Sequence, residues 1–225
     1  MSKMPARWRA PAQRTVVAVF VALWVASMSL YPGGNIFAPG SDGHDFTRNF
    51  LCDLLTPVTA DGRGNAPGAA LMNVAVVALT IGGLLPLWWR ASSNPLWRST
   101  ARSFGAAAAV LIGAICVDQA FGLRWSHNAV TLCAGALGLA PTAMVAATDW
   151  RAPRQKRLRR ALLLGTMAAS LVNFVSYALV QLGNPLTPVV PISQKVALLG
   201  LLGWMSIDPV GRPAAATSPP GDGRA

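Results

Sequence analysis

Glutamate is absent from this chain of 225 residues, and its eight acidic residues are all aspartates. Only 12% of the residues are charged, whereas a soluble domain carries about 25%. So small a share of charge cannot cover a water-facing surface, and 53% of the residues are hydrophobic. These shortages exclude an ordinary soluble domain and indicate an integral membrane protein.

Motifs of known catalytic or metal centres are also missing. The cysteines Cys52, Cys116 and Cys133 form neither a CxxC pair nor a zinc spacing. No GxSxG, HxxxH or HExxH occurs. We therefore predict no cofactor and no metal. His44 and His127 together with aspartates leave a metal site open only as an alternative, because imidazole and carboxylate are suitable ligands.

Basic residues give the chain a net charge of +11. In a soluble protein this charge would suggest nucleic acid as the partner. Here it falls almost entirely in short loops between apolar runs, so we predict that the partner is the lipid bilayer and not nucleic acid.

Long apolar runs are what the sequence does have. A helix needs about 20 apolar residues to cross the hydrocarbon core, and six segments meet this length. They are 15–31, 68–89, 104–123, 127–148, 160–182 and 190–207. The fold class predicted is all-α, a polytopic membrane helix bundle of six transmembrane helices.

Loop charge predicts the orientation of these helices. Thirteen Lys and Arg residues lie in the N-terminal segment and in the loops 90–103 and 149–160, against three on the alternate side. By the positive-inside rule both termini are cytoplasmic. We divide the chain into a basic cytoplasmic N-terminus (1–14), a transmembrane domain (15–207) and a disordered cytoplasmic tail (208–225), which is rich in Pro, Gly and Ala.

One outward loop is unlike its surroundings. It contains the stretch "HDFTRNFLCDLL", in which apolar residues recur at helical spacing and Asp45, Asn49 and Asp53 fall on another face. This pattern predicts a short interfacial helix over about 45–55, too short to span. It forms a lid if Asp53 points toward Asp118 and His127, and a rim if Asp53 points to water.

Ionisable residues inside a span are costly and mark functional sites by default. Asp118 lies about one turn inside the outward end of the third span, and Lys195 at the matching depth of the sixth. We predict that the two share one polar layer. Lys195 reaching back to the interface and Asp118 pairing with Arg124 are the structural alternatives.

Further polar residues fall in the same outward layer by their distance from the helix ends. The predicted ligand-binding residues are Asp118, Lys195, His127, Asp53, Asn73 and Tyr177. A one-sided polar layer indicates a pocket open to the outside, so the function predicted is binding or handling of a lipid or small amphiphile. An intramembrane hydrolase, with or without a metal, and a structural or assembly partner are the alternatives.

The run "YPGG…NFLCDLL…N" after the first span, with a histidine in a later outward turn, resembles an uncharacterised family of small six-helix bacterial membrane proteins. That family is a domain of unknown function, distantly similar in layout to the DRAM-like proteins, in which an "SDLG"-type segment follows the first helix. Cys52 to Leu55 read "CDLL" at that place. The resemblance implies the cytoplasmic (inner) membrane of a bacterium and implies no activity.

Overall fold

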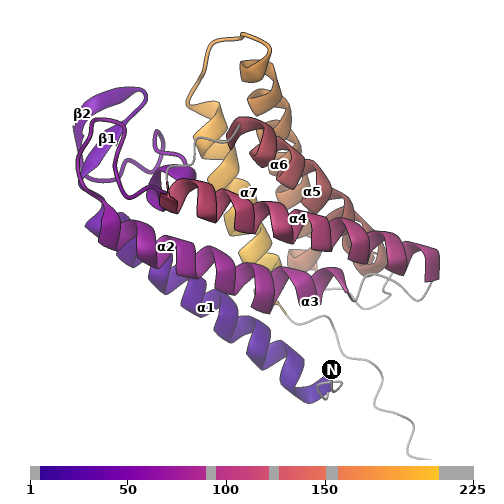
Figure 1. Ribbon diagram of the computed structural model, residues 1–225. Helices are drawn as coiled ribbons and strands as arrows, with labels where there is room; N and C mark the ends of the chain where they lie inside the picture. The colour runs from indigo at the N-terminus through magenta and orange to yellow at the C-terminus, as the bar shows by residue number, and fades with distance from the viewer. Residues whose placement is uncertain (1–5, 90–94, 122–126, 151–156, 208–225) are drawn as a thin grey trace, which may run out of the picture.

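The computed structural model describes residues 6–89, 95–121, 127–150 and 157–207 (Figure 1). Within them lie six helices that are long and apolar enough to cross a membrane. The prediction of an all-α, multi-pass membrane protein is therefore confirmed. The tail 208–225 and Arg124 lie outside the described residues. The predicted disorder of the tail and the alternative pairing of Asp118 with Arg124 therefore stay predictions.

The spanning helices differ from the predicted segments mainly at their ends. The first is α1 (Ala6–Leu30), and the second combines α2 (Ala66–Leu79), a π-helical turn η2 (Thr80–Leu84) and α3 (Leu85–Trp88). The others are α4 (Pro95–Phe121), α5 (His127–Trp150), α6 (Arg157–Gln181) and α7 (Val189–Ser206). Helices α1, α4 and α6 begin several residues earlier than predicted, because basic residues extend each helix beyond its apolar stretch.

Consecutive helices pack in pairs. Helix α1 packs mainly on α2, α4 on α5, and α6 on α7, whereas α5 and α6 touch each other over a smaller surface. Helix α7 also reaches α1, which closes the arrangement on that side. The core between the pairs contains large buried side chains, among them Phe20, Met72, Trp88 and Trp204. The looser contact between α5 and α6 leaves room for a cavity.

The π-helical turn in the second span has a cause in the sequence. Pro86 lies in the first turn of α3 and has no N–H to donate. The N–H of Leu85 reaches back five residues to the carbonyl of Thr80, which is the π-type hydrogen bond. Leu84 of this turn and Trp88 of α3 line the cavity described below.

The segment 31–65, which we name the cap, joins α1 to α2 at the end of the bundle away from the N-terminus (Figure 1). It contains an antiparallel hairpin of β1 (Gly33–Asn35) and β2 (Ala38–Asp42) and a 3₁₀ helix η1 (Cys52–Leu55). Gly33 adopts φ +120°, and a Cβ there would lie 2.2 Å from the Ser41 carbonyl oxygen. Only glycine fits where the chain leaves α1 and enters the hairpin.

The continuous helix predicted over 45–55 is wrong in detail. A turn at 45–49 is followed by η1, and the apolar side chains of Leu54 and Leu55 are buried. Asp45 Oδ1 accepts the N–H groups of Thr47 and Arg48, which caps the turn at 45–49 as it would cap a helix. The helix is interrupted after this turn because the side-chain oxygens of Asp53 and Gln194 accept the N–H groups of Phe50 and Leu51, which a continuing α-helix would use.

Candidate ligand cavity beneath the cap

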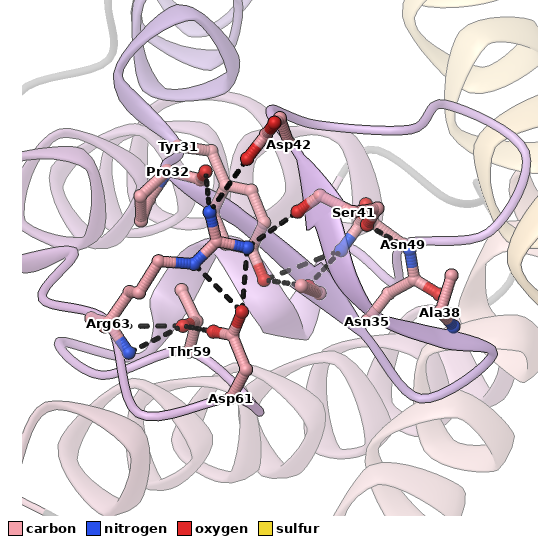
Figure 2. Close-up of polar contacts among 11 residues, drawn as sticks. Tyr31, Pro32, Asn35, Ala38, Ser41, Asp42, Asn49, Thr59, Asp61 and Arg63 are labelled. Carbon is pink, nitrogen blue, oxygen red and sulfur yellow. Dashed lines mark hydrogen bonds and ion pairs between the residues drawn. The ribbon is translucent and has the colours of Figure 1, made fainter.

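Arg63 fixes the two halves of the cap to each other (Figure 2). Its guanidinium donates to the carbonyl oxygens of Pro32 at 2.8 Å and Ser41 at 2.5 Å. It also pairs with the carboxylates of Asp61 at 2.6 Å and Asp42 at 3.1 Å. The paired guanidinium and the Thr59 hydroxyl lower the pKa of Asp61 to about 2. The hairpin is therefore held as one body with the chain that enters α2.

Asn49 is the centre of a second, buried network (Figure 2). Its Nδ2 donates to the carbonyl oxygen of Gly34 at 3.2 Å and to Asp53 Oδ2 at 3.1 Å. The Tyr31 hydroxyl donates to the same Gly34 oxygen at 2.8 Å. Asn49 therefore ties the end of the hairpin to the acidic residue of η1, and its side chain is 0% exposed.

Helix α7 anchors the cap from below through two adjacent polar residues. The Nζ of Lys195 donates to the carbonyl oxygen of Asn49 and, at 3.4 Å, to that of Pro191. Gln194 Oε1 accepts the N–H of Leu51 at 2.9 Å. Lys195 is 0% exposed, so reaching back to the interface is excluded as its role. Its ammonium also lies 5.2 Å from the ring centroid of Phe46, a cation–π distance.

A cavity of about 470 Å³ lies beneath the cap, between the α4–α5 and α6–α7 pairs. Asp53 and Phe50 of the cap line it together with polar side chains near the start of α5 and the end of α6, His127, Asn128 and Tyr177. Its remaining wall is mostly apolar. That wall includes Leu84, Trp88, Ile112, Leu139, Phe174 and Leu201.

Two threonine hydroxyl groups deeper in the cavity are occupied by partners in the protein. Thr142 Oγ1 donates to the Gly138 carbonyl oxygen at 2.7 Å and accepts from Trp88 Nε1 at 3.0 Å. Thr166 Oγ1 donates to the carbonyl oxygen of Leu162 at 2.7 Å. These bonds leave the deep part of the cavity apolar in character.

Burial determines the electrostatics of the cap side of the cavity. Burial raises the pKa of Asp53, while hydrogen bonds from the Phe50 N–H and Asn49 and the charges of Lys195 and His127 act in the lowering direction. Asp53 therefore lies in the field of both the anchoring lysine and the histidine. Asp53 lines the cavity together with His127, which favours a lid over a rim.

His127 connects α4 and α5 at the cap end of the bundle. Its Nδ1 lies 3.7 Å from Asp118 Oδ2 and 2.6 Å from Gln119 Nε2. Its Nε2 lies 3.5 Å from the hydroxyl of Thr131. The order carboxylate, imidazole, hydroxyl is that of a hydrolytic triad.

The distances argue against that chemistry. His127 Nδ1 lies 3.7 Å from the Asp118 carboxylate, and Nε2 lies 3.5 Å from the Thr131 hydroxyl. Both distances exceed the reach of about 2.6–3.2 Å over which a general base acts. The arrangement therefore supports hydrogen bonding to a ligand rather than activation of a nucleophile.

The predicted site residues fall into two groups. Asp53, His127 and Tyr177 line the cavity, and Asp118 lies behind His127. Lys195 and Asn73 instead hold the cap, Asn73 through Nδ2, which donates to the Leu55 carbonyl oxygen at 3.1 Å. The shared layer of Asp118 and Lys195 stays a prediction, because their described contacts lead to His127 and to backbone carbonyls respectively.

Sequence reasoning missed three residues of the site. Asn128 accepts from the Tyr177 hydroxyl at 2.6 Å, and Asn173 Nδ2 donates to the Val190 carbonyl oxygen at 2.9 Å. Gln194 docks the cap and also lines the cavity. All three are amides near the cap ends of their helices, where polar residues are common, so only their positions relative to the cap distinguish them.

Within the part of the chain that the structure describes, no three His, Cys, Asp or Glu side chains gather where they could hold a metal ion. His44 packs edge-on against Tyr31, with ring centroids 5.8 Å apart, and does not line the cavity as His127 does. Comparison with known proteins adds no further constraint, since no family model, curated protein or solved structure matches the chain.

Proposed function

We propose that the protein binds a lipid or small amphiphile in the cavity beneath the cap, on the outer side of a bacterial cytoplasmic membrane. The observation that carries the proposal is the composition of the cavity wall, polar under the cap and apolar farther in. A volume of about 470 Å³ falls within the range of about 300–1,000 Å³ typical of small-molecule sites. Such a wall matches a ligand with a polar head and a hydrocarbon chain.

Filling the cavity tests the proposal. Gly135 lines the cavity, and a Cβ there would meet only Phe174, at 3.9 Å. We therefore expect Gly135→Leu to fold and to occupy the space. Gly165→Leu makes the same change on α6, where a Cβ meets no atom within 4 Å.

The measurement is mass spectrometry of amphiphiles that co-purify with the protein in a mild detergent. We expect wild type and Gly165→Leu to retain a bound amphiphile and Gly135→Leu to lose it. Equal retention by all three would contradict the proposal, as would the absence of any bound amphiphile from wild type. The second result would favour a structural or assembly partner.

A further inference from the structure

The formal charge in the wall of the cavity is negative. Asp53 is the carboxylate in its wall, and no lysine or arginine lines it within the described part of the chain. Lys195 is close by, but its ammonium is occupied by the carbonyl oxygens of Asn49 and Pro191 and by the face of Phe46. An anionic head group would therefore meet a carboxylate and find no available cation.

Asp53 has one oxygen engaged and one available. Oδ2 accepts the Phe50 N–H at 2.8 Å and Asn49 Nδ2 at 3.1 Å, which fixes the orientation of the carboxylate. Oδ1 accepts from none of the described residues. Since the wall around it is largely apolar, a charge-assisted hydrogen bond to this oxygen is stronger there than in water.

Aromatic rings accompany this carboxylate in the cavity wall. Phe50 lies three residues before Asp53, and Tyr177 and Phe174 lie on successive turns of α6. The face of an aromatic ring attracts a cation, and a carboxylate beside such faces is a common way to recognise an ammonium group. The same rings give an anionic head no compensation.

We infer that the ligand is a single-chain amphiphile with an ammonium head, which donates to Asp53 Oδ1 while its chain extends along Leu84, Ile112 and Leu201. The inference rests on the proposed function and specifies its ligand class. No bond to the ligand is made or broken. Tighter binding of an anionic amphiphile is the alternative result that the test can give.

Dodecylammonium is the probe, with dodecanol and dodecyl sulfate as neutral and anionic probes of the same chain length. The full chain is placed in nanodiscs of a digalactosyl diglyceride, whose head is uncharged, and binding is measured with subtraction of empty nanodiscs. We expect wild type to bind dodecylammonium about tenfold or more tightly than either other probe, the effect of one charged hydrogen bond.

Asp53→Asn should remove this preference, so that the variant binds dodecylammonium no more tightly than dodecanol. Asp42→Asn is the matched control, since Asp42 is an exposed carboxylate of the same cap that does not line the cavity. Because Asp53→Asn also alters a buried network, hydrogen exchange of residues 31–65 verifies that the cap remains docked. The comparison of the three probes on wild type does not depend on that variant.

The outcomes separate the inference from the proposed function. Equal binding of all probes, tighter binding of dodecyl sulfate, or a preference that survives in Asp53→Asn would overturn the ammonium head while amphiphile binding stands. If Gly135→Leu binds all three probes as wild type does, the cavity is not their site and the proposed function fails with the inference.

Discussion

At the scale of single residues, the buried side chain of Lys195 defines what the cap requires. An ammonium buried in an apolar bundle must find oxygen partners, because an unpaired charge inside a membrane costs roughly 2.5–3.5 kcal/mol on insertion scales. The carbonyl oxygen of Asn49 supplies one. That oxygen is available only because the chain at 45–49 turns instead of continuing as a helix. The buried lysine and the broken helix therefore require each other.

His44 makes docking of the cap sensitive to acid. Burial lowers its pKa to about 4 from 6.5, Lys195 acts in the same direction, and Asp45 acts against them. Between pH 6.5 and 4 the undocked cap takes up a proton that the docked cap does not, so docking is at full strength above pH 6.5 and weakens as the pH falls. We expect a loss of about 1–2 kcal/mol by pH 5.

Hydrogen exchange of residues 31–65 at pH 7 and pH 5, corrected for the intrinsic effect of pH, measures this loss. The substitution His44→Gln should flatten the pH dependence, because glutamine does not titrate. An equal pH dependence in wild type and His44→Gln would assign the acid sensitivity to another group.

Residue types in the sequence identified three side chains that line the cavity, and the reason is energetic. Asp53, His127 and Tyr177 are found in the cavity wall, and each is a polar group near membrane depth whose burial needs a reason. Lys195 and Asn73 satisfy the same criterion but serve the backbone of the cap. Depth along a helix is visible in a sequence, whereas rotation about its axis and the path of a loop above it are not.

At the scale of elements, close contact between α3 and α4 depends on one small residue. A Cβ at Gly105 would lie 2.7 Å from the ring and 3.1 Å from the Cβ of Trp88. Trp88 cannot easily retreat, because its Nε1 donates to Thr142 and its ring is 2% exposed. The helices approach to the distance that glycine permits.

Gly105→Ala should therefore destabilise the protein. We expect a loss of about 1–3 kcal/mol, the usual cost of inserting a methyl group into a filled core, measured as a lower midpoint of thermal unfolding in detergent. Gly113→Ala is the control on the same helix, where a Cβ meets nothing within 4 Å. It should leave the midpoint unchanged or raise it. Equal midpoints for the two variants would show that α4 can move away from Trp88.

Hydrogen bonds hold both ends of α7. At its C-terminal end Arg159 donates to the carbonyl oxygens of Trp204 and Ile207, and Arg14 Nε donates to that of Ser206 at 3.2 Å. Cations suit the negative end of a helix dipole. At its other end Gln194 and Lys195 hold the cap. Helix α7 therefore fixes the position of the cap relative to the bundle.

At the scale of the whole molecule, we expect the cap to face outward and the loop 151–156 to face the cytoplasm. In a variant without Cys52, Cys116 and Cys133, a single cysteine at Ser41 should react with a membrane-impermeant maleimide in intact cells. A single cysteine at Arg154 should react only after the membrane is opened. The basis is the excess of Lys and Arg on one side of the predicted spans, and labelling of Arg154→Cys in intact cells would reverse the orientation.

The six spans were predictable as a set because each depends on its own length of apolar sequence. The cap was not, because its docking onto α7 depends on Gln194 and Lys195, which lie far along the chain. The stretch 45–55 has a helical pattern, but the side-chain oxygens of Asp53 and Gln194 compete for the N–H groups of Phe50 and Leu51. The cavity was predictable only as a polar layer, since its volume comes from how α5 and α6 pack.

The contact between Lys195 and Asn49 joins residues 146 positions apart, which has a consequence for biosynthesis. At about 5–20 residues per second, the ribosome makes Asn49 roughly 7–30 s before Lys195. During that interval the cap has been made while α7, the helix that anchors it, has not. Of the described helices α7 is made after the others, so the wall that it supplies to the cavity and the anchor of the cap are added only once the rest of the cavity has been made.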